Sequence, residues 1–166
     1  NPLTPPEVLA RMAKSPDTFE GAYDPERERV EMIRNPSLPT EVIPLLYKRA
    51  LAVIEPVDDS PGRKALDKAA GFSTQDIGSL ERALDNAVAN NPNSPPEILR
   101  DIVNRTVKKY GLEWGTLYWI ARNPNTPVDV LQMLSKSKDP NVKRNALDQL
   151  DNQYRGIAEN FKRFLK

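Results

Sequence analysis

Apolar residues in this chain recur at helical spacing in short, paired segments. Four segments open on two adjacent apolar residues, and three further segments run up to an Asn-Pro dipeptide. The opening pairs are Val8/Leu9, Val42/Ile43, Ile98/Leu99 and Val130/Leu131. The segments before the dipeptide are "RVEMIRNP", "LDNAVANNP" and "LYWIARNP". The pattern predicts pairs of amphipathic helices, each of which buries one apolar stripe against its neighbours.

Near-copies of one nonapeptide separate these predicted helices. The copies are "NPLTPPEVL" from Asn1, "NPSLPTEVI" from Asn35, "NPNSPPEIL" from Asn91 and "NPNTPVDVL" from Asn123, at spacings of 34, 56 and 32 residues. Proline lacks an N–H and disfavours the helical conformation in the residue before it. Each Asn-Pro therefore predicts the end of a helix.

The residues that follow each Asn-Pro predict the start of the next helix. In the last copy, Thr126 is expected to supply a side-chain N-cap and Pro127 to take the first helical position. Ser94 has the same place in the third copy. Leu38 takes this place in the second copy, so the cap is missing there, and we expect that helix to begin less sharply, near Thr40.

The stretch "ARNPNTPVDVLQMLSKSKDPNVKRNAL", residues 121–147, resembles the leucine-rich repeat variant family. The resemblance lies in the Asn-Pro-x-Thr-Pro start, the Val-Leu pair, and four positions of the second helix: Asp139, Pro140, Val142 and Arg144. "YDPERERVEMIRNP", residues 23–36, keeps the Asp-Pro start. The resemblance implies a superhelix of short helical pairs, related in shape to HEAT and armadillo arrays. The cysteine-rich iron–sulfur segment of the family's founding member does not carry over, because this chain has no cysteine.

These features predict an all-α fold, a short right-handed α-solenoid of stacked helical hairpins in a single repeat domain over residues 1–166. The units are expected to start near residues 1, 35, 91 and 123. The longer interval before Asn91 predicts an insertion or a degenerate unit at about 55–90. Within it, "SPG" at Ser60 and "STQ" near Thr74 predict helix starts.

The last segment predicts one long helix over about residues 140–165. Its apolar residues keep helical spacing nearly to the end: Val142, Ala146, Leu147, Leu150, Tyr154, Ile157, Ala158, Phe161 and Leu165. Such a helix either covers the exposed core of a repeat stack or docks a partner. We favour the covering role, because the end units of repeat stacks usually differ from the others.

Composition excludes several kinds of chemistry. The chain has neither cysteine nor histidine, which removes thiol nucleophiles and the commonest general base and metal ligand. Asp58–Asp59 is the closest carboxylate candidate, and its Pro/Ser/Gly turn indicates solvated side chains instead. We therefore expect no enzyme, no cofactor and no metal site. The lack of cysteine fits a cytoplasmic location, and no apolar run approaches the ~20 residues of a membrane span.

The charge is balanced overall and uneven along the chain. The 24 Lys+Arg and 23 Asp+Glu residues give a net charge of +1. Residues 1–90 hold 11 basic and 15 acidic side chains, whereas residues 91–166 hold 13 and 8. A near-zero total does not indicate nucleic acid or a membrane as the partner. The positive second half keeps nucleic acid open as an alternative.

The candidate binding residues lie in that second half, around "KKYGLEWGTLYW" at 108–119. They combine aromatic side chains, which are frequent at interface hot spots, with cations: Lys108, Lys109, Tyr110, Trp114, Tyr118, Arg122, Lys143 and Arg144. We expect Trp119 to pack inward with Leu117 and Ile120, and Tyr118 to be partly covered. The role of Trp114 is open between anchor and core.

The sequence thus predicts a non-enzymatic protein–protein interaction or scaffold module. Stacked repeats present an extended curved face without chemistry of their own, and the step from this fold to that function is an analogy. The expected partner is another protein or a peptide segment, and an acidic segment would suit the cations. The alternative is nucleic-acid binding through residues 91–166.

Overall fold

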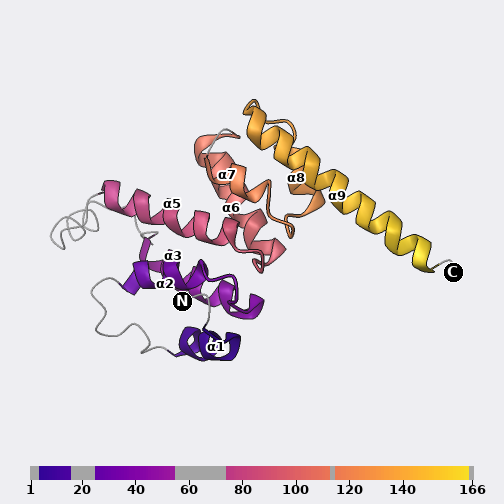
Figure 1. Cartoon of the computed structure of the whole chain (residues 1–166). Helices are drawn as coiled ribbons and strands as arrows, with labels where there is room; N and C mark the ends of the chain where they lie inside the picture. Colours follow the sequence, from indigo (N-terminus) through magenta and orange to yellow (C-terminus); the bar gives the residue numbers. More distant parts are fainter. Residues whose placement is uncertain (1–3, 16–24, 55–73, 113–114, 165–166) are drawn as a thin grey trace. The chain divides into compact units, whose positions relative to one another are not determined.

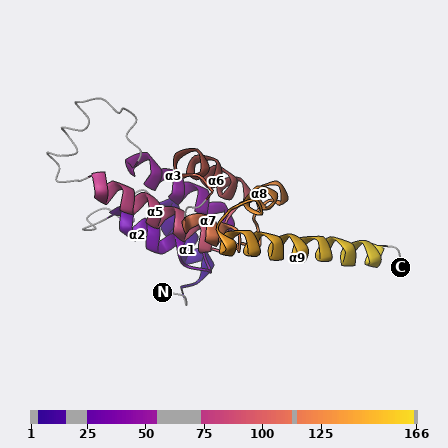
Figure 2. The ribbon, with the colours of Figure 1, turned by 90° about the horizontal axis from the view of Figure 1, so that it is seen from above.

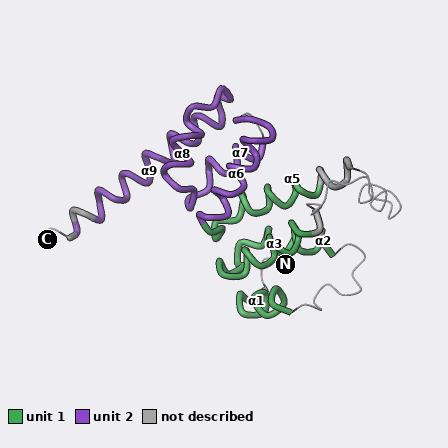
Figure 3. Tube along the Cα trace, turned by 180° about the vertical axis from the view of Figure 1, so that it is seen from behind, with its two compact units in different colours: residues 1–95 green, residues 96–166 purple. Residues whose placement is uncertain are grey.

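The computed structural model describes residues 4–15, 25–54, 74–112 and 115–164. In these ranges the chain forms helices and no strand, which confirms the all-α prediction. The chain divides into two compact units, residues 1–95 and residues 96–166 (Figure 3). Each unit is described by itself.

In its described ranges unit 1 contains four α-helices (Figure 1). Their bounds are α1 Pro6–Lys14, α2 Pro25–Ile33, α3 Ile43–Ile54 and α5 Thr74–Asn90, with a short 3-10 helix, η2 Thr40–Val42, leading into α3. Helices α2, α3 and α5 pack against one another, and α1 packs against η2 and α3. The largest fully buried side chains of this core are Ile33, Leu38, Ile43, Leu46 and Leu84.

The described ranges of unit 2 also contain four α-helices (Figure 2). Its helices are α6 Pro96–Tyr110, α7 Gly115–Ile120, α8 Val128–Leu134 and α9 Pro140–Phe164. Helix α9 packs against α8 and α7, and α7 also packs against α6. The core between them is formed by fully buried side chains: Leu99, Ile102, Leu117, Ile120, Leu131 and Leu134.

Each described Asn-Pro corner folds around its buried asparagine. The Oδ1 atoms of Asn35, Asn91 and Asn123 accept the backbone N–H two residues later, at 2.9, 2.8 and 3.0 Å. All three side chains are buried. The preceding helices end at Ile33, Asn90 and Ile120, within three residues of the corner asparagine. The predicted helix ends are therefore confirmed, and asparagine contributes to them as well as proline.

In the third and fourth copies, the hydroxyl after Asn-Pro serves the preceding helix and not the following one. Thr126 Oγ1 donates to Ile120 O at 2.6 Å, and Ser94 Oγ donates to Val88 O at 2.6 Å. Helix α8 begins one residue later than predicted, with Pro127 at its N-cap and no side-chain cap bond. The N-cap prediction was wrong, because the carbonyls at the end of a helix need donors as much as its first N–H groups need acceptors.

The second copy departs from the others as the sequence predicted. Leu38 is fully buried where the other copies place a hydroxyl. The next helix begins as η2 from Thr40, with Pro39 as its N-cap, before α3 continues it. An apolar residue cannot donate to the preceding helix, so at this position burial replaces the hydroxyl bond of the other copies.

The two corners of unit 1 are joined by side-chain amides. Asn91 Nδ2 donates to Ile33 O at 2.6 Å and to Asn35 O at 3.0 Å. Asn93 Nδ2 donates to Pro36 O at 2.9 Å and to Leu38 O at 3.0 Å. Asn91 and Asn93 thus donate to four backbone carbonyls in and beside the Asn35 corner. Backbone carbonyls that loops leave unpaired in the interior are satisfied in this way.

Part of the predicted insertion at about 55–90 is a helix that belongs to the core of unit 1. Helix α5 begins at Thr74, as predicted, and packs against α2 and α3. The predicted start at Ser60 lies outside the described residues.

The predicted terminal helix is a single helix, α9, whose first half is packed into unit 2. Asp139 Oδ1 accepts the N–H groups of Asn141 and Val142 at 2.8 and 3.3 Å, which caps its start. The side chains that face the unit are buried: Val142, Ala146 and Leu150. Gln153 Nε2 then donates to Pro124 O at 3.2 Å and to Thr126 O at 2.9 Å. The first half of α9 therefore covers this unit, which is the role that we favoured.

The bridge between corners predicts a specific loss of stability for Asn91→Asp. The substitution keeps the Oδ1 that accepts the N–H of Asn93 and replaces the Nδ2 donor by an oxygen that faces two carbonyls. We expect a loss of about 2–4 kcal/mol in the free energy of unfolding at neutral pH, measured in urea. Asn90→Asp is the control, because the side chain of Asn90 is exposed and its Nδ2 donates within its own helix, to Asn86 O at 2.9 Å; it should cost about 1 kcal/mol or less. Equal stability of the two variants would contradict the bridge.

Candidate functional site

Helix α7 and the turn that follows it carry a cluster of two aromatic rings and one cation at the surface. The rings of Tyr118 and Trp119 meet edge to face, with centroids 4.9 Å apart and an interplanar angle of 85°. The Arg122 guanidinium carbon lies 5.6 Å from the Tyr118 ring centroid and 6.0 Å from that of Trp119. Arg122 Nη1 also donates to the Tyr118 hydroxyl at 2.8 Å. These three residues are called the aromatic cluster.

The position of Trp119 corrects the sequence prediction. Its side chain was expected in the core, and it is 37% exposed, whereas Leu117 and Ile120 are fully buried as predicted. Helix α7 has only six residues, and the inward face is taken by Thr116, Leu117 and Ile120. At 100° per residue the remaining positions point outward. Tyr118 is half-buried, as expected.

The end of α6 brings a second group of predicted residues to the surface. Lys108, Lys109 and Tyr110 are exposed, and Lys109 Nζ lies 5.0 Å from the centroid of the Tyr110 ring. Gly111 follows at φ +79°, and its N–H donates to Val107 O at 2.9 Å. Glycine adopts this left-handed conformation without the cost that a Cβ imposes, so it ends the helix here.

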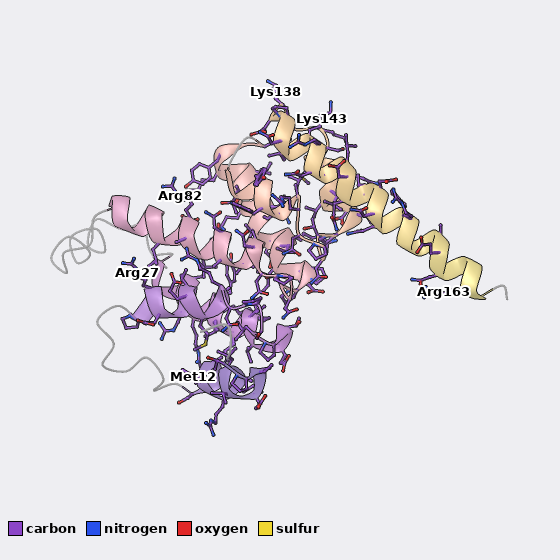
Figure 4. All side chains as sticks on the ribbon, viewed as in Figure 1. Met12, Arg27, Arg82, Lys138, Lys143 and Arg163 are labelled. Atoms are coloured by element: carbon purple, nitrogen blue, oxygen red, sulfur yellow. The ribbon has the colours of Figure 1, made fainter. Side chains whose placement is uncertain are left out.

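The loop before α9 lies beside the end of α6. Ser137 Oγ donates to Leu112 O at 2.8 Å, which joins the two segments. Figure 4 shows Lys138 and Lys143 where this loop enters α9. The hydrogen bond therefore places the cations of the loop and of the first turns of α9 close to those at the end of α6.

Five cations at this end of unit 2 have no ion pair with the described residues. They are exposed, and together they are called the basic end: Lys108, Lys136, Lys138, Lys143 and Arg144. Unit 2 holds 13 basic and 8 acidic residues, a net charge of +5. Unpaired cations on a positively charged unit attract anionic groups.

The carboxylate of Asp129 is already paired elsewhere. Arg100 Nη2 lies 2.8 Å from Asp129 Oδ1, and Arg100 Nε lies 3.3 Å from Oδ2. The hydrogen bond from Arg100 lowers the pKa of Asp129 below its ordinary value of 3.8. A lowered pKa stabilises the fold above that value, and the contribution is lost as the pH falls through the folded-state pKa. Both side chains are exposed, so the pair contributes little.

The structure brings the predicted binding residues together in two groups. Tyr118 and Arg122 contact each other in the aromatic cluster. The remaining described ones lie at or beside the basic end: Lys108, Lys109, Tyr110, Lys143 and Arg144. Trp114 lies outside the described residues. Trp119 was missing from the predicted set, and the inward spacing of Thr116, Leu117 and Ile120 was the signal that would have shown it to be exposed.

No group of three or more Asp, Glu, His or Cys side chains that could hold a metal ion occurs in the described ranges. An open depression of about 650 Å³ lies in unit 1. It is lined by Pro6, Glu7, Ala10, Arg11, Lys14, Pro39 and Glu41. None of the helices in the described ranges has the length and apolarity to cross a membrane.

No family model, curated protein or solved structure matches this chain. The resemblance to leucine-rich repeat variant proteins therefore stays a prediction from the sequence.

The exposure of Trp119 predicts that it contributes little to folding. We expect Trp119→Ala to lower the free energy of unfolding by about 1 kcal/mol or less, because its outer face is in water. Leu117→Ala, two residues earlier and fully buried, should cost about 2–5 kcal/mol. Urea unfolding of both variants measures the difference. A loss for Trp119→Ala as large as that for Leu117→Ala would place the indole in the core and remove the aromatic cluster from the surface.

Proposed function

We propose that this chain is a non-enzymatic protein–protein interaction module that binds its partner through unit 2. The observation that carries the proposal is the aromatic cluster on α7. Trp, Tyr and Arg are the residue types that dominate binding energy at interfaces. A Trp side chain that is 37% exposed beside a fully packed core does not serve folding alone. The cluster is also rigid before binding, because the Tyr118 hydroxyl bond holds Arg122.

The charge of unit 2 supports an acidic protein or peptide segment as the partner. The basic end supplies five exposed cations. Among the three nitrogens of the Arg122 guanidinium, only Nη1 has a hydrogen-bond acceptor in the described ranges. Its other N–H groups suit a carboxylate, which a guanidinium binds through two parallel hydrogen bonds. The aromatic cluster would supply affinity, and the basic end would supply orientation and a faster association rate.

We further propose that the helical pairs belong to an α-solenoid of the leucine-rich repeat variant kind, working in the cytoplasm. The bridged corners of unit 1 support the repeat architecture, because a stack needs each unit to contact its neighbour in the same way. The absence of cysteine supports the location.

Nucleic-acid binding is the second candidate, and the basic end is the observation that favours it. Five cations that lack a carboxylate partner in the described ranges would also suit a phosphate backbone. Against it, the aromatic contact that the described part of unit 2 shows is one pair, Tyr118 with Trp119, and not a series on which successive bases could stack.

Affinity capture with matched variants tests the proposal. The chain is used as bait in extract from its native source, with and without nuclease, and the captured partner is then titrated against each variant. We expect capture to survive nuclease, and Trp119→Ala and Arg122→Ala each to weaken binding at least tenfold (about 1.4 kcal/mol). Met133→Ala is the control, because Met133 on α8 is also 37% exposed. Equal loss in all three variants would contradict a role for the aromatic cluster.

The salt dependence of the same titration separates the two candidates. Release of counterions from about five phosphates would lower affinity several hundredfold between roughly 50 and 200 mM salt. We expect a change of about tenfold or less for a protein segment anchored by Trp119. Loss of capture on nuclease treatment together with the steep salt response would overturn the first candidate in favour of nucleic acid.

A further inference from the structure

Helix α9 carries a row of apolar residues that continues, largely exposed, into its second half. Leu147 is 48% exposed, Tyr154 51% and Ile157 61%, whereas Leu150 is 9% exposed and covered by unit 2. The intervals between these four residues alternate between three and four. In the sequence of α9 the alternation continues through Phe161 and Phe164. Alternating three- and four-residue intervals are the spacing by which two helices pair as a coiled coil.

Unit 2 covers α9 only as far as its middle. Gln153 donates to the Asn123 corner, and Gln132 Nε2 lies 3.5 Å from the Tyr154 hydroxyl. Figures 1 and 2 show α9 continuing beyond α8 after this point. The row therefore extends past its own core, where an apolar face in water is unfavourable and marks an interaction site.

The Asn123 corner, which lies beside this row, could not bind a further repeat in the way that the Asn35 corner binds the Asn91 corner. In unit 1 the carbonyls of Pro36 and Leu38 accept from Asn93 of the next corner. In unit 2 the equivalent carbonyls, those of Pro124 and Thr126, accept from Gln153 of α9 itself. Gln153 thus occupies the place that the amide of a following corner would take.

We propose that the second half of α9 pairs with the same segment of a second copy of the chain, in antiparallel orientation. The positions that flank the row from Tyr154 onward are uncharged, namely Gln153, Ala158 and Asn160. A helix with flanking charges of one sign would repel its own copy, and these positions avoid that repulsion. The charged residues of this half that are described lie on the opposite side of the helix: Arg155, Glu159 and Arg163.

The packing of unit 2 sets the orientation. Helix α8 packs against the first half of α9, so parallel pairing would bring two copies of the remainder of unit 2 to the same end. Antiparallel overlap centred near Glu159 places them at opposite ends. The overlap from Tyr154 to Phe164 spans about 15 Å at 1.5 Å per residue. It would bury an area at the low end of specific interfaces, so the dimer is expected to dissociate in the roughly micromolar to millimolar range.

Sedimentation equilibrium of the full chain between roughly 1 µM and 1 mM tests the pairing. The parent chain should show a monomer–dimer equilibrium. Ile157→Glu places two carboxylates in the symmetric interface and should weaken the dimer at least tenfold, while far-UV circular dichroism shows that helix content is kept. Asn152→Glu is the matched control on the outer side of α9, and it should dimerise like the parent. A parent chain that stays monomeric throughout, or an Ile157→Glu variant that dimerises normally, would overturn the proposal.

Single introduced cysteines test the orientation, because the chain has none of its own. In the antiparallel pair, residue 158 lies next to residue 158 of the other copy, whereas residue 147 has no counterpart opposite it. Under mild oxidation Ala158→Cys should form a disulfide-linked dimer and Leu147→Cys should not. Equal cross-linking of the two variants would overturn the antiparallel arrangement.

Discussion

The fold depends on buried asparagines at the corners between helical pairs. Each corner turns the chain sharply, so it leaves backbone carbonyls that neither helix can satisfy. Asn91 meets this constraint with both ends of its amide: Oδ1 accepts within its own corner, and Nδ2 donates to two carbonyls of the preceding corner. Local turn formation and the register between neighbouring pairs thus depend on the same side chain. The Oδ1 bond recurs at Asn35 and Asn123, which accounts for an asparagine at each described corner.

The same constraint positions the candidate surfaces of unit 2. At the Asn123 corner the donor to the carbonyls of Pro124 and Thr126 comes from Gln153 of a helix, which has a longer side chain than the corner asparagine that it replaces. This bond marks where α9 stops being part of the core and where its exposed apolar row continues. Helix α7 ends at the same corner, and its short length turns Trp119 outward. Both candidate surfaces, the aromatic cluster and the apolar row of α9, therefore lie next to the Asn123 corner.

The sequence predicted the features that local chemistry decides. Helix ends at Asn-Pro, the irregular start after Leu38 and the single terminal helix all follow from proline, capping and apolar spacing. It did not predict the partner of Thr126, because a hydroxyl next to two helix ends can serve either of them. Nor did it predict the bridge from Asn91 to Ile33, which joins residues 58 positions apart in the chain. Trp119 was predicted to be buried because large apolar side chains usually are. It is exposed because the inward positions of the six-residue α7 are taken by Thr116, Leu117 and Ile120.

The central claim is that the side-chain amide of Asn91 is held in the interior by two carbonyls of the preceding corner. Hydrogen exchange of the asparagine side-chain amides, followed residue by residue by NMR, measures this directly. We predict that the Nδ2 protons of Asn91 exchange only through global unfolding, as slowly as the most protected backbone amides of α5. Those of Asn90, whose Nδ2 donates to Asn86 O on the exposed face of α5, should exchange far faster. Equally rapid exchange at Asn91 and Asn90 would contradict the account.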